Sequence, residues 1–199
     1  MLKLQKISQE EPYLLFKNLF QKAKKYSDPL IDVISISSYD KNLDEVNTRF
    51  VNLKYIINDE WVFFTNYQSD KAKQFKDNNN IAATMYWKSI DVQIRIKAKI
   101  FKSSKSLSDM HFNGRKKEKN ALAISSSQSR PITSYEEVKK NYANTLNNNE
   151  IILTRPNYWG GYSFFPYSFE FWTGHHSRVN KRELFELKSN KWKKSILQP

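Results

Sequence analysis

The stretch WTGHHSRVNKR (172–182) concentrates side chains that could bind an anion or a metal ion. Arg178 and Arg182 are four residues apart, so on one strand they would share a face, where arginine favours two-pronged contact with phosphate or carboxylate. A metal site is the weaker interpretation of His175 and His176, because adjacent strand residues point to opposite faces and no carboxylate or third histidine is suitably spaced. We therefore predict no metal site, and we expect the two histidines to occupy a surface turn.

Three more stretches carry groups that suit a phosphate. TRFVNLK (48–54) has the alternation of a strand, which places its two cations on opposite faces. FFTNYQSDKA (63–72) ends a strand and opens a helix, and a helix N-terminus with hydroxyl and ammonium groups nearby is a ready anion site. SSQSRPI (126–132) offers hydroxyl and amide groups between helices. Taken alone, each stretch could equally be a solvated strand edge, an ordinary helix cap or a polar loop.

Composition limits the class of protein. The 199 residues include no cysteine, which excludes a disulfide framework and a thiolate metal or redox site. No N-terminal apolar run resembles a signal peptide and no apolar stretch is long enough to span a bilayer, so we expect a cytoplasmic protein with no membrane partner. The net charge of +13 would attract polyanions. Its basic residues are mostly lysine and are spread along the chain, so we expect no specific nucleic-acid partner.

The elements that must position these groups follow from periodicity. β-Branched and aromatic residues between polar turns predict strands over 31–38, 48–57, 61–66, 81–87, 91–101, 162–173 and 179–188. Helices are expected over 8–25, where Ser8 and Glu11 predict a capping box, over 69–78, and in three pieces within 104–149. Several short strands with few helices favour a small barrel. We expect one domain over 1–199, mainly β with flanking helices, with an N-terminal helical segment (1–28) and a helical insertion between barrel strands (104–149).

Two more stretches belong with the four quoted above: WGGYSFFPYSFEF, which directly precedes WTGHHSRVNKR, and the ending KWKKSILQP. Taken in chain order, this set resembles the pyridoxamine 5′-phosphate oxidase family. Each motif alone is modest, but the ordered set is specific and runs from about residue 30 to the C-terminus. The resemblance implies a homodimeric FMN-binding split β-barrel with FMN in clefts between the subunits. It also implies oxidation of pyridoxine 5′-phosphate and pyridoxamine 5′-phosphate to pyridoxal 5′-phosphate. Hydride would pass from substrate C4′ to flavin N5, and O2 would be reduced to H2O2.

The resemblance further implies roles for individual residues. FMN would be bound by Arg49, Phe50, Val51, Asn52, Leu53, Lys54, Phe64, Thr65, Lys71, Gln93, Gln128, Ser129, Trp172 and Arg182, with the pair at 128 and 129 coming from the other subunit. The substrate would be bound by Lys54, His111, Arg115, Lys119, Arg178 and Asn180. Arg49 and Lys71 would reach the phosphate of FMN, and Arg115 that of the substrate. Arg178, over the pyridine ring, and Lys54, close to flavin and substrate, are the catalytic candidates.

The chain departs from the family's pattern at four positions. Asp70 stands where the family usually has arginine, which should weaken FMN binding. His111 replaces a substrate-contacting tyrosine and Lys119 replaces a serine, and both can still serve a phosphate. Asn180 replaces the histidine of an Arg-x-His pattern, and asparagine cannot titrate near neutral pH. If that histidine tunes the substrate, turnover should be slower or the substrate different.

Three alternatives stay open beside the oxidase. A flavoenzyme of the same fold could act on another substrate, such as a flavin- or F420-type reductase; positions 111, 119 and 180 favour it, whereas Arg115 and Arg178 argue against it. A non-catalytic binding protein for FMN or pyridoxal phosphate would show no substrate-dependent flavin reduction. A nucleic-acid-binding protein would show strong, salt-dependent affinity for DNA or RNA.

Overall fold

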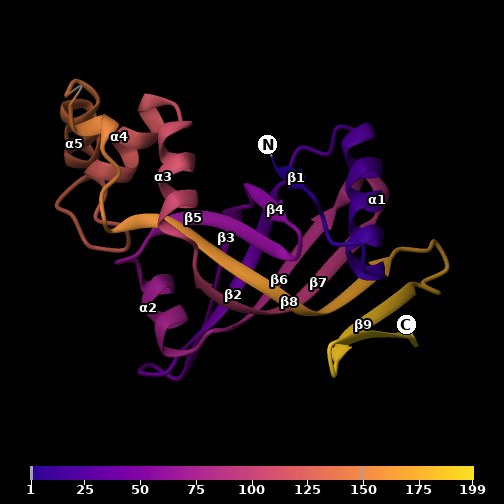
Figure 1. Ribbon diagram of the computed structural model, residues 1–199. Coiled ribbons are helices and arrows are strands. Elements are labelled where there is room, and N and C mark those ends of the chain that lie inside the picture. Colours follow the sequence, from indigo (N-terminus) through magenta and orange to yellow (C-terminus); the bar gives the residue numbers. More distant parts are fainter. Residues whose placement is uncertain (1, 149) are drawn as a thin grey trace.

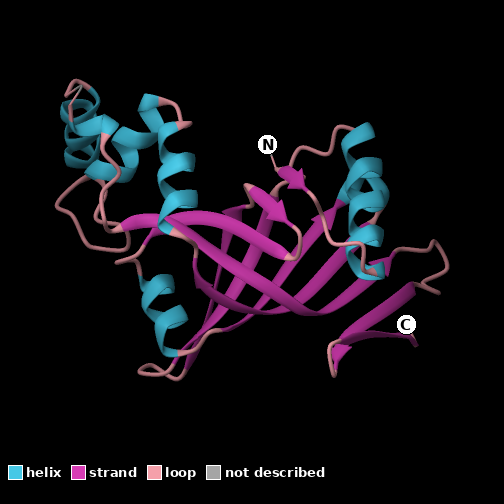
Figure 2. Cartoon of the chain, in the orientation of Figure 1, coloured by secondary structure: helices cyan, strands magenta, loops and turns pink. Residues whose placement is uncertain are grey.

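The computed structural model describes residues 2–148 and 150–199, and its ten described strands belong to one sheet. Figure 1 shows this sheet curling around a core, with helices at both ends. The strand order is β1-β4-β5-β8-β7-β6-β2-β3, and β9 and β10 continue from β8. Apart from the parallel β1–β4 pair, the paired strands are antiparallel. The mainly β architecture with flanking helices agrees with the prediction (Figure 2).

The strands are β1 (Lys3–Gln5), β2 (Val33–Asp40), β3 (Glu45–Asn52), β4 (Tyr55–Ile57), β5 (Glu60–Asn66), β6 (Asn80–Trp87), β7 (Val92–Lys102), β8 (Trp159–Thr173), β9 (Lys181–Lys188) and β10 (Lys191–Leu197). The helices are α1 (Glu11–Lys25), α2 (Asp70–Asp77), α3 (Lys105–Asn113), α4 (Lys117–Ser125) and α5 (Tyr135–Leu146). None of the helices described is long and apolar enough to cross a membrane.

The core is built from alternate residues of the strands and from the apolar face of α1. In β7 the expected alternation is present, and its apolar face from Val92 to Ile100 is buried. Phe16 of α1 is fully buried, and its ring centroid lies 4.5 Å from that of Trp61 and 5.5 Å from that of Trp87. Aromatic pairs at such distances contribute beyond the area they bury, so α1 is held as part of the core.

The first helix begins later than predicted. Its first residue is Glu11, the N-cap is Glu10, and no side chain caps the helix, so the predicted capping box is wrong. Ser8 instead accepts the backbone N–H of Glu10 at 3.3 Å, while its own N–H bonds to the carbonyl of Asn58 at 3.1 Å. The segment before α1 is thus kept extended by a distant loop, and Pro12 occupies the first turn, where a missing N–H costs little.

The single strand predicted over 48–57 is two strands, β3 and β4, separated by Leu53 and Lys54. The N–H of Leu53 bonds to the carbonyl of Asp32 at 2.8 Å, whereas the N–H of Lys54 bonds to the carbonyl of Val62 at 2.8 Å. The chain therefore passes from one pairing partner to another at this point. Local β-propensity cannot reveal such a change, because it depends on which strands lie on either side.

Candidate functional site

A buried cation, Lys71, and a half-buried one, Arg49, lie where β5 ends and α2 begins. Lys71 is only 8% exposed, and its Nζ lies 3.3 Å from the hydroxyl oxygens of both Thr65 and Ser69. Burial, followed by the positive charge of Arg49, lowers the pKa of Lys71 to about 8. No carboxylate in the described part of the chain forms an ion pair with either cation. Cations held in this way at a helix start are suited to a phosphate.

The guanidinium of Arg49 is fixed by neighbouring polar side chains. Arg49 of β3 is the register partner of Ile36 of β2, so the two side chains lie on the same face of the sheet. Its Nη1 donates to the hydroxyl of Ser38 at 2.6 Å, and its Nη2 donates to Oε1 of Gln74 at 3.1 Å. Gln74 belongs to α2, so this contact also ties the helix to β3. Sequence reasoning missed Ser38 and Gln74, because nothing local marks them as partners of an arginine on another element.

A second group of rings and cations surrounds the end of α3. The His111 ring stacks on Phe64 with centroids 3.7 Å apart and planes 8° apart, and Phe64 stacks on Trp159 at 5.5 Å. The guanidinium carbon of Arg115 lies 4.3 Å from the Trp159 ring centroid. A cavity of about 220 Å³ lies here, lined among others by Arg115, Lys119, Trp159, Thr65, Asn66 and Gln128. Phe64, Thr65, His111, Arg115, Lys119 and Gln128, predicted from sequence as site residues, are thus brought together.

Charge in this second group is unbalanced. Arg115 Nη2 donates to the carbonyl of Lys119 at 2.9 Å, but its Nη1 is buried with no hydrogen-bond partner in the described residues. Burial lowers the pKa of Arg115 to about 10. The pKa of His111 falls to about 4, first through burial and then through the charges of Arg115, Lys54, Lys3 and Lys119. Buried donors of this kind call for an anionic acceptor.

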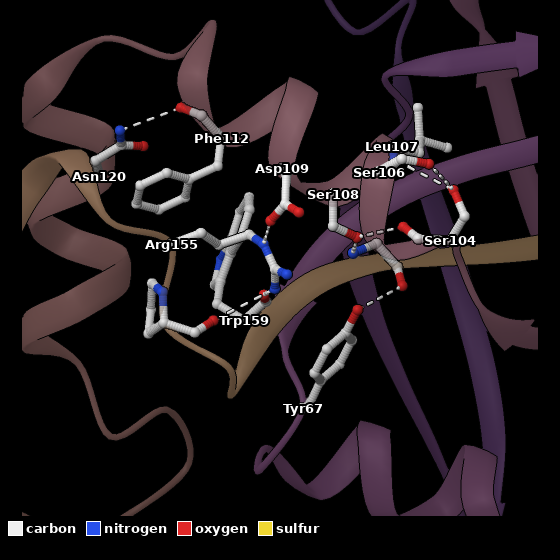
Figure 3. A network of polar contacts seen from close by, with 12 residues as sticks. Tyr67, Ser104, Ser106, Leu107, Ser108, Asp109, Phe112, Asn120, Arg155 and Trp159 are labelled. Atoms are coloured by element: carbon white, nitrogen blue, oxygen red, sulfur yellow. Dashed lines mark hydrogen bonds and ion pairs between the residues drawn. The ribbon is translucent and has the colours of Figure 1, made fainter.

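A network of polar contacts fixes α3 to the start of β8 (Figure 3). Arg155 donates from Nε to Asp109 at 2.6 Å and from Nη1 to the carbonyl of Trp159 at 2.5 Å. The N–H of Gly161 donates to the Ser108 hydroxyl at 3.1 Å, and its carbonyl accepts from the Tyr67 hydroxyl at 3.1 Å. These contacts hold α3, which carries His111, against β8, which carries Trp159.

The glycine pair in WGGY has a packing role in this network. A Cβ added to Gly160 would overlap the hydroxyl of Tyr67, and one added to Gly161 would lie 2.5 Å from the Ser103 hydroxyl oxygen. Both glycines therefore permit side chains to approach the backbone of β8 closely. The sequence singled out the pair, but not the residues that need it.

Gln128 lies beside Thr65 within the same chain. The hydroxyl of Thr65 donates to Oε1 of Gln128 at 3.0 Å. Ser129 follows with a φ of +70° and is exposed. The expected contribution of residues 128 and 129 to a partner's site stays a prediction.

A third group lies in a row across β7, β8 and β9. Gln93 is the register partner of Trp172, which is the partner of Arg182, so the three side chains share a sheet face. Glu170 accepts from Nε of Arg182 at 2.9 Å and pairs with Nη1 of Arg95 at 2.8 Å. The three residues were predicted to contact FMN, but their alignment in one row and the carboxylate that contacts Arg182 were not predicted.

The remaining predicted FMN residues are spread over both faces of β3 and the crossover after it. Phe50 is 77% exposed and Asn52 is also exposed, whereas Val51 is half-buried and Leu53 is fully buried. Lys54 is half-buried, with its Nζ 3.5 Å from a carboxylate oxygen of Asp32. A ligand on the exposed face could meet the first two through their side chains, but Leu53 only through its backbone.

The turn after β8 differs from the prediction. Arg178 is not on a strand with Arg182, because β9 begins only at Lys181; it has a φ of +61° in an exposed turn. Asn180 accepts the N–H of His175 at 3.1 Å and so helps to close the turn. His175 and His176 are exposed in this turn, as expected. No group of three or more metal-ligating side chains occurs in the described part of the chain.

The groups near Arg115 and near Arg178 lie at opposite ends of β8, and Figure 1 shows α3 and α4 near the start of that strand. Arg115 packs on Trp159, the first residue of the strand, and Arg178 follows its last residue, Thr173. A strand of 15 residues extends roughly 50 Å when straight. One chain therefore does not bring both arginines to one small ligand.

Comparisons with known proteins bear on these groups. Residues 159–199 match the family model described as the pyridoxine 5′-phosphate oxidase C-terminal dimerisation region. A pyridoxine/pyridoxamine 5′-phosphate oxidase from Leptospira biflexa is 34% identical over 190 residues, which cover 95% of this chain and 89% of that protein.

Two solved structures share the fold. PhzG from Burkholderia lata, in complex with tetrahydrophenazine-1-carboxylic acid, has a TM-score of 0.90 at 24% identity, covering 96% of this chain and 93% of that one. A pyridoxamine 5′-phosphate oxidase-related, FMN-binding protein from Nostoc punctiforme has a TM-score of 0.76 at 11% identity, covering 92% and 97%. The expected split barrel is confirmed.

Proposed function

Since the chain belongs to the pyridoxine/pyridoxamine 5′-phosphate oxidase family, we propose that it oxidises pyridoxine 5′-phosphate and pyridoxamine 5′-phosphate to pyridoxal 5′-phosphate with FMN as cofactor. The observation that carries the substrate class is Arg115. Its buried Nη1 has no acceptor among the described residues. Lys119 and His111 lie close to Arg115 and belong to the same pocket. A phosphomonoester dianion supplies both the acceptor oxygens and the charge that this pocket requires.

The first group of cations fits the phosphate of FMN. Arg49 is already oriented by Ser38 and Gln74, and Lys71 is buried at the start of α2. We place the phosphate of FMN between these two cations, with the hydroxyl of Thr65 beside it. Gln93, Trp172 and Arg182 would border the ring system, since their row presents amide, indole and guanidinium groups on one face.

When bound, FMN would supply the electron chemistry, with substrate C4′ as the hydride donor and O2 as the final acceptor, which would yield H2O2. The protein binds and orients. Arg115, Lys119 and His111 hold the substrate phosphate, and Lys54 lies where flavin and substrate meet. No side chain has to act as a covalent nucleophile.

The separation along β8 supports a site shared between two chains. Arg178 and the row ending at Arg182 lie at the opposite end of the strand from Arg115 and Lys71. A homodimer can join the two ends by bringing the turn of one chain to the pocket of the other. The match of residues 159–199 to a dimerisation region agrees with this arrangement.

An anaerobic titration of the FMN-loaded protein with pyridoxine 5′-phosphate tests the proposed function. Bleaching of the flavin absorbance, followed by recovery in air, is the expected result. A flavin that stays oxidised while the phosphate compound binds would overturn the oxidase assignment. Failure to bind FMN at all would limit the family likeness to the fold.

A second candidate is oxidation of a different substrate on the same fold. The structurally similar PhzG binds a tetrahydrophenazine carboxylate, and the departures at His111, Lys119 and Asn180 fall among the substrate residues. Comparing pyridoxine with pyridoxine 5′-phosphate separates the two candidates. If the phosphate is the handle, the unphosphorylated compound should reduce the flavin far more slowly. Equal rates, or faster reduction by a tricyclic carboxylate, would favour the second candidate.

A further inference from the structure

Tyr55, the first residue of β4, is joined to His111 in a way the family likeness does not explain. Its hydroxyl lies 2.9 Å from Nδ1 of the imidazole, and the two rings meet edge-on, with centroids 5.4 Å apart and an interplanar angle of 86°. On its flat face the imidazole stacks on Phe64. Both the plane of the His111 ring and the direction of Nδ1 are therefore fixed before any ligand binds.

The surroundings keep the imidazole neutral. The charged groups that face it are Arg115, Lys54, Lys3 and Lys119, which come from three different parts of the chain and are all cationic. With burial, these charges lower the pKa of His111 to about 4. At neutral pH the ring therefore carries one proton, either on Nδ1 or on Nε2.

The hydrogen bonding of Tyr55 decides between the two tautomers. The residue is 7% exposed, and the Nδ1 contact is the one hydrogen bond that its hydroxyl makes among the described residues. If Nδ1 carried the proton, the phenolic hydrogen would be left without an acceptor in a buried place, which is costly. If the phenol donates, both groups are satisfied and the imidazole proton must be on Nε2.

We propose that Tyr55 is a positioning residue that donates to Nδ1 of His111 and thereby holds the proton on Nε2, where it can donate to the substrate phosphate. A phosphate dianion offers only acceptors, so the other tautomer would present a lone pair to it and repel it. The inference rests on the proposed function in one respect: it takes the ligand of this pocket to be a phosphate. According to this inference, the tautomer of His111 determines how well phosphate binds.

The tautomer can be read directly by nitrogen NMR of the FMN-loaded protein with labelled histidine. We expect an unprotonated Nδ1 and a protonated Nε2 for His111 at neutral pH. A protonated Nδ1 would overturn the proposal whatever the enzyme's activity.

Affinity for inorganic phosphate gives a second readout, because FMN already occupies its own phosphate site in the loaded protein. Tyr55→Phe removes one hydrogen bond and the tautomer bias, so phosphate affinity should fall about fivefold. In a His111→Tyr background the same change should have no effect, because a phenol has no second tautomer. The matched control is Tyr39→Phe, at an exposed hydroxyl bonded to Asp44, which should leave affinity unchanged.

Two results of this cycle would refute the role of Tyr55. An equal loss in both backgrounds would mean that Tyr55 acts through packing, and no loss in the wild-type background would mean that it does not act on phosphate at all. None of these measurements requires oxidation of a substrate. A protein that passes them but is not reduced by pyridoxine 5′-phosphate would therefore refute the proposed function and leave this inference standing.

Discussion

At the start of β8, the candidate side chains are buried or half-buried and pack on one another, whereas at its end they project from an exposed turn. His111, Arg115 and Trp159 pack ring on ring and cation on ring. Arg178 is held in its turn by a backbone bond, from its N–H to the carbonyl of His175 at 2.8 Å. The start of β8 is organised by side-chain contacts within one chain, whereas the turn after its end is shaped mainly by backbone hydrogen bonding.

The difference indicates distinct contributions to ligand binding from the start of β8 and from the turn after its end. Burying cations without carboxylates costs stability, and a ligand that supplies the negative charge offsets this cost on binding. Such a preorganised pocket is suited to recognising phosphate. The exposed turn that carries Arg178 is compatible with the proposed contact to a ligand held by a second chain.

The largest effect is expected when two inactive variants are mixed, which tests whether the two ends of β8 from different chains form one site. Arg115→Ala and Arg178→Ala should each lower kcat/KM roughly hundredfold, since a bond to a charged group contributes up to about 3 kcal/mol. If the two arginines of one site come from different chains, random subunit exchange should restore about a quarter of wild-type activity. The measurement is oxidase activity after mixing, with each variant mixed with itself as control. No recovery after proven exchange would place both arginines in the same chain's site.

Removing Arg49 tests the pocket end directly. Arg49→Ala should weaken FMN binding roughly 10- to 100-fold through loss of a charge-assisted contact. Fluorescence titration and dialysis measure this. Lys76→Ala is the matched control, because Lys76 is an exposed cation in the last turn of α2, away from the helix start. Full retention of FMN by Arg49→Ala would remove this arginine from the phosphate site.

The lowered pKa of Lys71 gives the pocket end a pH signature. A phosphate dianion favours the charged lysine, and in the FMN-free protein that charge is lost as pH rises through about 8. FMN affinity should therefore be highest below that pH and fall above it. Lys71→Arg, which keeps its charge, should remove the dependence. An FMN affinity that does not change across this pH range would contradict a contact between Lys71 and the phosphate.

The smallest effect is expected at Asp70, the anion at the first position of α2. Asp70→Arg should tighten FMN binding about threefold, because surface charges contribute at most about 1 kcal/mol. Asp77→Arg, at the other end of the helix, provides the control for net charge. Weaker binding by Asp70→Arg would show that this position does not face the phosphate.

Much of the fold was accessible from local pattern. The alternation of β7 and the helix over 69–78 appeared within a residue or so of the expected bounds. The break after Asn52 and the absence of strand structure at Arg178 did not follow from the pattern, because both depend on which strands pair across the sheet. The roles of the site residues stay predictions, although the structure brings several of them together.

By itself the sequence determined the supply of groups: aromatic and β-branched residues for a curled sheet, and arginines, lysines and hydroxyls in an ordered set that resembles one family. Only the tertiary structure decided their pairing. Tyr55 is hydrogen-bonded to His111 and Arg49 to Gln74. Arg115 and Arg178 lie at opposite ends of β8. Burial, hydrogen-bond partners and pKa shifts arise from contacts between residues far apart in sequence, and no local spacing encodes these contacts.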